Sequence, residues 1–132
     1  MKKLKKILLV DDDRLSSTVS KFVLEDLDVA EEVVEVGNGR QAIDLLGRDA
    51  RSGWAAPDLI LLDLEMPVMD GLEFIEQLPK KESLARLLDR IVLLTSSVNP
   101  YHERTAKAMG VKWFLHRPLS ARNLQPVLAS LA

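Results

Sequence analysis

Residues 57–71 read PDLILLDLEMPVMDG, an apolar run that ends in an acid and is followed by a loop. The run Leu59–Leu62 is continuously apolar, which is typical of a strand covered on both faces in a parallel sheet. Asp63 stands where this strand would end. Asp70 and Glu73 resemble a capping box, which predicts a helix directly after the loop. This segment therefore predicts one strand–loop–helix unit in the middle of the chain.

Similar apolar runs lie on both sides of this unit: Ile7–Val10, Val33–Val36, Ile91–Leu94 and Trp113–Leu115. Segments with three- and four-residue apolar spacing separate them, as in amphipathic helices. The side chains expected on one face of the first helix are Leu15, Val19, Phe22, Val23 and Leu27. Those expected on one face of the last helix are Leu124, Val127, Leu128 and Leu131. The alternation predicts five βα units in an α/β sandwich, with helices on both faces of the sheet.

Helix boundaries have sequence signals of their own. Asn38 with Gln41 resembles a second capping box, and Asn99 followed by Pro100 fits a cap with proline at the first helical position. Gly110 stands where a helix would end in a left-handed residue. The stretch 78–90 gives no consistent pattern, because Pro79 interrupts it.

Composition limits the class of protein. With 132 residues the chain is long enough for one domain with a real core, and we expect a single domain over residues 1–132 with no output domain. A net charge of −2 gives no basic field for nucleic acid. The absence of cysteine excludes disulfides, thiolate zinc sites and thiol nucleophiles. The apolar run after the N-terminal lysines is too short for an export signal or a membrane span, so a cytoplasmic protein is expected.

Polar residues follow the predicted strands: Asp11, Asp12 and Asp13; Asp63; Thr95, Ser96 and Ser97; and Arg117 before Pro118. Functional groups of open α/β sheets gather beyond the carboxyl ends of the strands. Two like charges about 4 Å apart repel by roughly 4 kcal/mol at an effective dielectric near 20. A hard divalent cation such as Mg²⁺, which takes oxygen ligands, would relieve this repulsion. The acids would equally well be solvated loop residues, and their position at strand ends does not decide between these interpretations.

Four segments resemble the receiver domains of bacterial response regulators, and together they span nearly the whole chain: Ile7–Asp13, Pro57–Gly71, Leu93–Ser96 and Arg117–Pro118. The resemblance implies a flavodoxin-like, three-layer (βα)5 fold, with five parallel strands in the order 2-1-3-4-5. It implies a two-component signalling protein, not an enzyme that turns over a separate substrate.

The resemblance also assigns roles to individual residues. Asp63 would accept a phosphoryl group from a histidine kinase or a small phosphodonor. Asp11 and Asp12 would hold Mg²⁺ (or Mn²⁺) together with Asp63 and the backbone carbonyl of Glu65. Thr95, with Ser96 beside it, would bind the phosphoryl oxygens.

Further positions match residues that modulate signalling in the family. Phe114 occupies the place of a switch aromatic, although a plain core residue is nearly as good an interpretation. Glu65 and Ser97 would tune dephosphorylation, and the bond before Pro118 would be cis. The expected partners are a sensor histidine kinase or phosphotransfer protein and a downstream protein, with a self-dimer through the fourth helix, fifth strand and fifth helix as an alternative output. Direct contact with nucleic acid or membrane is not expected.

Arg117 departs from the family, which has lysine before this proline. Its planar five-donor fork either pairs with phosphoryl oxygens or lies across Asp63 as a fixed salt bridge. The first arrangement predicts an active phosphoacceptor, and the second predicts a pseudo-receiver that serves as an interaction module. A remote third alternative is a phosphatase with an aspartyl nucleophile, in which Glu65 would stand where haloacid-dehalogenase-type enzymes have a second aspartate.

Three further residues invite functional readings that the pattern does not support. His116 should point away from Arg117, because successive strand residues alternate, and we interpret it as a packed or half-exposed structural residue. His102 is expected at the solvated surface. Trp113 should face the side of the sheet opposite Phe114.

Overall fold

The computed structural model describes residues 3–53, 56–64, 66, 69–78, 87–95 and 100–131. Its strands are β1 (Leu4–Val10), β2 (Ala30–Val36), β3 (Leu59–Asp63), β4 (Ile91–Thr95) and β5 (Trp113–His116). Its helices are α1 (Arg14–Leu27), α2 (Gly39–Ser52), α3 (Gly71–Gln77), α4 (Pro100–Ala108) and α5 (Ala121–Leu131). The strands are parallel and lie in the order β2-β1-β3-β4-β5, which confirms the predicted flavodoxin-like topology.

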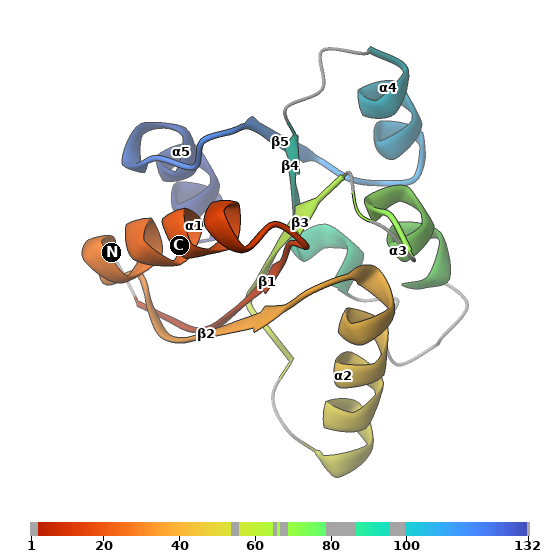
Figure 1. Cartoon of the computed structure of the whole chain (residues 1–132), viewed down its shortest axis with the longest axis horizontal. Helices are drawn as coiled ribbons and strands as arrows, with labels where there is room; N and C mark the ends of the chain where they lie inside the picture. The colour runs from red at the N-terminus through yellow and green to blue at the C-terminus, as the bar shows by residue number, and fades with distance from the viewer. Residues whose placement is uncertain are drawn as a thin grey trace.

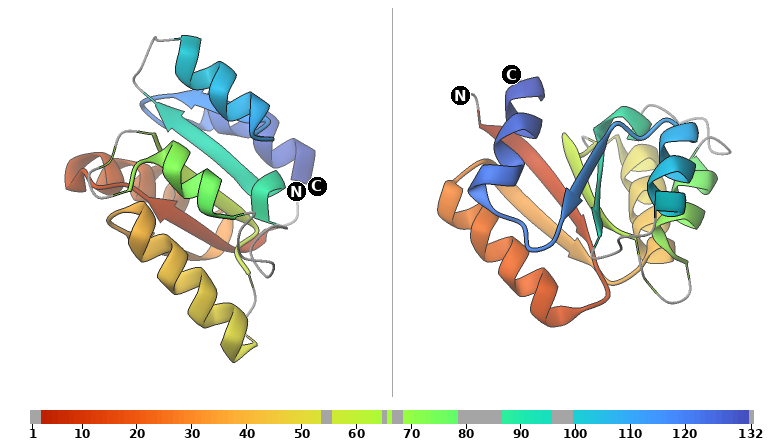
Figure 2. Two further views of the ribbon diagram at one scale, coloured as in Figure 1. Left: turned by 90° about the vertical axis from the view of Figure 1, so that its right-hand side faces the viewer. Right: turned by 90° about the horizontal axis from the view of Figure 1, so that it is seen from above.

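The sheet is the middle of three layers. Helices α1 and α5 cover one face, and α2, α3 and α4 cover the other (Figures 1 and 2). Successive residues of β1 separate into two cores, with Leu8 and Val10 under the three helices and Ile7 and Leu9 under the two. Both cores are dominated by Leu, Ile and Val, so apolar burial on two faces holds the central strands in place.

Burial separates the central strands from the edge strands. Every residue of β3 and β4 is buried, as the continuous apolar runs predicted. The edge strands are less covered: β2 exposes Glu31, Glu32 and Glu35, and β5 exposes His116. The expectation of two-sided burial therefore holds for the centre of the sheet. Strands β1 and β2 also begin three residues before the apolar runs predicted, because backbone pairing extends into their mixed N-terminal ends.

The predicted helix caps are largely present. The Asp70 side chain accepts from the Glu73 N–H and the Glu73 side chain from the Asp70 N–H, which completes a capping box. Asn38 caps α2, but the Gln41 side chain accepts from the Gly37 N–H at 2.7 Å, so that box is displaced by one residue. Gly110, two residues beyond the end of α4, has φ +107°, in agreement with the predicted helix end. Asn99 lies outside the described residues.

Helix α1 is rotated relative to the predicted face. Its buried residues are Ser17, Ser20 and Leu24, while Leu15 and Phe22 are 75% and 69% exposed. The predicted stripe was therefore wrong in part, although Val23 and Leu27 do pack against the core. Serines with the same three- and four-residue spacing form the buried face. Apolar spacing could not reveal that face, because its polar members are small enough to lie against the sheet.

The last helix follows the prediction more closely. Leu124, Val127 and Leu128 are buried against the sheet, but Leu131 is 38% exposed and does not complete the predicted face. Of the uncertain stretch 78–90, the structure describes Leu78, which is fully buried, and a short 3₁₀ turn over residues 87–90. Among the described helices, none has the length and apolar character needed to span a membrane.

Candidate functional site

Two acids meet where the neighbouring strands β1 and β3 end. Val10 of β1 pairs with Leu62 of β3, so the residues that follow them, Asp11 and Asp63, lie side by side at the ends of the two strands. One carboxylate oxygen from each of Asp11, Asp12 and Asp63 lies within 4.8 Å of the others. The structure therefore brings together the three acids that the sequence analysis selected. Asp11 and Asp63 are buried, at 5% and 6% exposure, while Asp12 is exposed.

Gly71 holds the end of β3 close to the start of α3. Its N–H donates to the Leu64 carbonyl at 2.9 Å. A Cβ at this position would lie 2.8 Å from the backbone oxygen of Asp63 and 2.9 Å from the Cα of Leu64. Both neighbours are backbone atoms that cannot rotate away, so only glycine permits this approach. The close approach of Gly71 to Asp63 was not predicted, although Gly71 ends the segment that resembles the receiver family.

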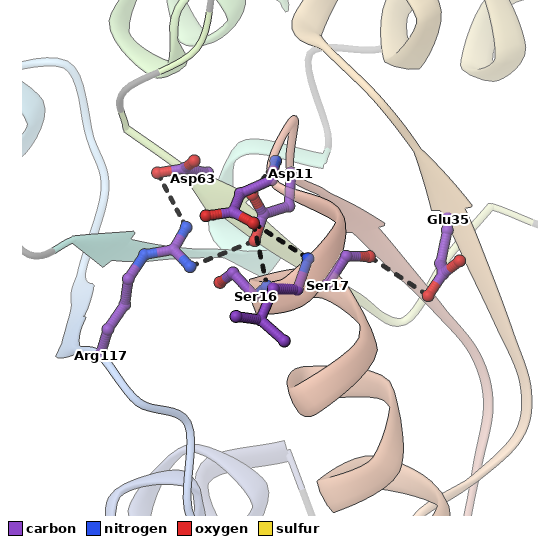
Figure 3. Close-up of polar contacts among 8 residues, drawn as sticks. Asp11, Ser16, Ser17, Glu35, Asp63 and Arg117 are labelled. Atoms are coloured by element: carbon purple, nitrogen blue, oxygen red, sulfur yellow. Dashed lines mark hydrogen bonds and ion pairs between the residues drawn. The ribbon is translucent and has the colours of Figure 1, made fainter.

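Arg117 reaches the acids from the end of the edge strand β5. Its backbone N–H donates to the Thr95 carbonyl at 3.1 Å, which ties the residue after β5 to the end of β4. Its guanidinium lies between the two buried acids (Figure 3). Nη1 donates to Oδ2 of Asp11 at 3.1 Å, and Nη2 lies 2.9 Å from Oδ1 of Asp63. The Asp63 contact is an ion pair without hydrogen-bond alignment. The Arg117–Pro118 peptide bond is cis, as predicted.

The electrostatic balance at Arg117 favours the charged guanidinium. Burial by itself would lower the pKa of Arg117, but the negative charges of Asp63 and Asp11 outweigh it, so the pKa lies above the ordinary value. Arg117 therefore contributes a positive charge to the site. A contact with Asp63 was one of the two arrangements predicted from the sequence, whereas the contact with Asp11 was not predicted.

Asp11 is engaged at both of its oxygens. The backbone N–H of Asp13 donates to Oδ1 at 2.9 Å, and Arg117 donates to Oδ2. The side chain of Asp13 points elsewhere, since it caps α1 by accepting from the N–H groups of Leu15 and Ser16. Asp13 therefore belongs to the start of α1 and is not among the acids of the cluster.

The donor set fits a divalent cation. Carboxylate oxygens are the ligands that Mg²⁺ and Mn²⁺ prefer. Three carboxylates and one guanidinium leave a formal charge of −2, which one such ion balances. Asp11, Asp12 and Asp63 would hold the ion. An open cavity of about 680 Å³ lies beside the cluster, with Asp11, Asp12, Arg14, Glu35 and Gln41 among its lining residues.

The remaining predicted residues are placed around this cluster. Thr95 is buried at the end of β4, next to the strand that carries Asp63. Phe114 is partly buried under the three-helix face, with the ammonium of Lys107 5.8 Å from its ring centroid. Trp113 packs against the opposite core, as strand alternation predicted. Glu65, Ser96 and Ser97, which were assigned to metal binding, phosphoryl binding and dephosphorylation, lie outside the described residues.

The two histidines do not join the site, although their environments differ from those expected. His116 is exposed instead of packed or half-exposed, because the edge strand β5 leaves that face uncovered. His102 is partly buried on α4, with its ring centroid 6.0 Å from that of Tyr101 in an edge-on arrangement.

Comparison with known proteins gives a consistent result. The model of the response regulator receiver domain matches residues 7–129. The chain is 30% identical to the probable methanogenesis regulatory protein FilR2 of Methanothrix harundinacea, over 90% of this chain and 76% of that protein. It is 31% identical to the two-component response regulator ARR22 of Arabidopsis thaliana, over 98% and 85%. It spans only 16% of the sensory/regulatory protein RpfC of Xanthomonas campestris, at 28% identity over 96% of this chain.

Solved structures show the same fold. A two-component response regulator from Cytophaga hutchinsonii superposes with a TM-score of 0.88 at 26% identity, over 98% of both chains. A phosphorylated cyanobacterial phytochrome response regulator, RcpA, gives 0.74 at 29% identity, over 96% of this chain and 88% of that one. The Mn²⁺-bound form of the response regulator Rcp1 gives 0.74 at 26% identity, over 96% and 91%.

Proposed function

Because this chain belongs to the response regulator receiver domain family, we propose that it accepts a phosphoryl group on Asp63 in the presence of Mg²⁺ and passes the signal on by a change of shape. Receiver domains of two-component systems interact with histidine kinases or phosphotransfer proteins, and one of these would be the donor. The proposed activity is self-modification of this chain, without turnover of a separate substrate.

One observation carries the proposal. Asp63 ends a central strand, an oxygen of its carboxylate lies within 4.8 Å of an oxygen of Asp11 and of Asp12, and the guanidinium of Arg117 contacts it at 2.9 Å. A carboxylate surrounded by cation-binding groups is suited to phosphoryl transfer, which depends mainly on positioning and on neutralising the charge of the phosphoryl oxygens. The geometry supports Asp63 as the acceptor because, of the three acids, it alone terminates a buried strand in contact with both Gly71 and Arg117.

The proposed step needs no general base. An oxygen of the ionised Asp63 carboxylate attacks the phosphorus of the donor while the bond from phosphorus to the donor's nitrogen or oxygen breaks, which leaves an acyl phosphate on Asp63. The hydroxyl of Thr95, which ends the neighbouring strand β4, would donate to a phosphoryl oxygen. A bound divalent ion would neutralise charge on the phosphoryl oxygens, and Asp11 and Asp12 would hold it.

Two structural relatives support these two parts of the proposal. RcpA has been observed phosphorylated, and Rcp1 has been observed with Mn²⁺ bound. Both align over 96% of this chain.

The output would come from α4, β5 and α5. Thr95 ends β4, which pairs with β5, and Phe114 of β5 lies under Lys107 of α4. A phosphoryl group that draws in the Thr95 hydroxyl would alter the packing around Phe114 and so shift α4. We propose that this face binds a downstream protein or a second copy of the chain.

A specific contact favours a second candidate function. Arg117 already pairs with both Asp63 and Asp11, and a guanidinium fixed in that position would keep phosphoryl groups out. The chain would then be a pseudo-receiver that acts as a protein-interaction module. Replacing Arg117 by lysine separates the two functions, since phosphorylation that appears only in Arg117→Lys would establish the pseudo-receiver.

Mass spectrometry tests the leading proposal directly. After incubation with a low-molecular-weight phosphodonor and Mg²⁺, the parent chain should gain one phosphoryl group, and Asp63→Asn should gain none. Asp13→Asn is the matched control, because Asp13 caps α1 and does not belong to the acid cluster. A parent chain that stays unmodified, and shows no binding of beryllofluoride with Mg²⁺, would rule out phosphoacceptance.

A further inference from the structure

Arg117 occupies one oxygen of each of two acids that the proposed metal site needs. Nη1 donates to Oδ2 of Asp11 at 3.1 Å and Nη2 lies 2.9 Å from Oδ1 of Asp63. The other oxygen of Asp11 accepts from the Asp13 N–H. An ion that approaches Asp11 therefore meets a carboxylate whose oxygens are both engaged.

The shape of the side chain makes this double contact available. A guanidinium is a planar fork whose two terminal nitrogens can contact two carboxylates at once, whereas an ammonium is a single compact charge. Here the two terminal nitrogens contact different acids, on β3 and after β1, and so bridge them (Figure 3). The bridge places a positive charge among the oxygens that a cation would coordinate.

We propose that Arg117 is an internal counter-ion that competes with the divalent cation for Asp11 and Asp63, so that metal binding requires the guanidinium to leave at least the Asp11 contact. The proposal rests on the proposed metal site, and it concerns the order of events there. Cation binding would release the guanidinium from Asp11, and the freed fork would then be available to the incoming phosphoryl group at Asp63.

The competition has a reciprocal consequence. If Arg117 weakens metal binding, then bound metal must weaken the stabilising effect of Arg117 by the same factor. Without metal, loss of the guanidinium should destabilise the fold, because three neighbouring carboxylates lose their counter-ion. With saturating metal, this loss should be smaller.

Direct titration with the metal alone tests the competition. Mn²⁺ binding is followed by electron paramagnetic resonance, and Mg²⁺ binding by calorimetry, in the parent, in Arg117→Gln and in Arg122→Gln. Arg122 is an exposed arginine on α5 and serves as the matched control. Removing a positive charge from beside the ion should tighten binding by about tenfold in Arg117→Gln. Arg122→Gln should bind as the parent does.

The outcomes separate this inference from the proposed function. Equal affinity in the parent and Arg117→Gln would overturn the competition and leave the metal site standing. Absence of binding in all three proteins would overturn the metal site, and with it the inference. If Arg117→Gln does not fold, Arg117→Lys is titrated instead. Tighter binding is again expected, because the single nitrogen of an ammonium replaces the two separate nitrogens that each contact one acid; unchanged affinity would overturn the proposal. As an independent measurement, Mg²⁺ should raise the Tm of the variant more than that of the parent.

Discussion

Two partly buried ion-pair sites among the described residues lie toward opposite ends of the sheet and differ in their charge balance. Toward the end where the strands begin, Lys6 of β1 pairs with Asp49 of α2 at 3.1 Å, with side chains 14% and 6% exposed. Where the strands finish, Arg117 pairs with Asp11 and Asp63, whose side chains are 1% and 8% exposed, and Asp12 lies beside them. The first site has one cation for one anion, whereas the second has three anions for one cation.

Under the proposed function, this difference distinguishes an ion pair that stabilises the fold from one that belongs to a binding site. The Lys6–Asp49 pair is neutral as a unit and needs no further ion. The cluster around Arg117 keeps a formal charge of −2 that the folded chain leaves for a ligand. Natural proteins tolerate such local imbalance mainly at functional sites, at some cost in stability. Removing the charge of an acid should therefore lower stability at the first site and raise it at the second, when no metal is bound.

The largest effect is expected at the balanced pair. Asp49→Asn leaves the Lys6 ammonium without its partner in a largely buried position, so the free energy of unfolding should fall by about 3 kcal/mol. Urea denaturation at neutral pH measures the change. A loss below about 1 kcal/mol, the value typical of exposed pairs, would show that this pair behaves as a solvated one.

The next largest effect is expected at Gly71, which sets the position of the acid cluster. The added Cβ of Gly71→Ala would press on the backbone of Asp63 and Leu64, so the free energy of unfolding should fall by about 2 kcal/mol. Gly47→Ala in α2 is the matched control, since the nearest atom to its Cβ is an Arg51 side-chain nitrogen at 3.4 Å, and helix propensity predicts a gain of up to about 1 kcal/mol. Similar losses in both variants would contradict the close approach.

A smaller change, of opposite sign, is expected at the unbalanced cluster. Asp12→Asn removes one of three neighbouring negative charges, and without metal the free energy of unfolding should rise by about 1 kcal/mol. Repeating the denaturation with Mg²⁺ should reduce or reverse this gain, because the variant loses an ion ligand. Destabilisation of the metal-free variant would count against repulsion among the acids.

The smallest effect is expected at an ion pair that is short but exposed to solvent. Lys3 lies 2.7 Å from Asp28, closer than Lys6 lies to Asp49, but these side chains are 42% and 76% exposed. Solvent screening should hold the effect of Lys3→Gln below about 0.5 kcal/mol in the same denaturation experiment. If this change cost as much as Asp49→Asn, distance and not burial would determine the energy of ion pairs in this protein.

Local sequence patterns predicted the elements well and their exposed faces less well. The apolar runs located all five strands, and side-chain capping located the starts of α2 and α3. The face of α1 was not predictable in this way. Its buried side contains Ser17 and Ser20, whereas Phe22 is 69% exposed, so hydrophobicity alone indicated the wrong side. Neighbouring elements decide which face of a helix is covered, and a single segment carries no information about them.

The sequence by itself determined the succession of strands and helices along the chain, because that depends on short-range spacing. It also determined that acids gather at the strand ends, because the carboxyl ends of parallel strands lie at one edge of the sheet. Only the tertiary structure decided that Arg117 bridges Asp11 and Asp63, that Gly71 touches the backbone of Asp63, and that Lys6 meets Asp49. These contacts join distant parts of the chain or depend on how a loop closes. Their existence follows from distances of a few ångströms between packed elements, which no local pattern of residues specifies.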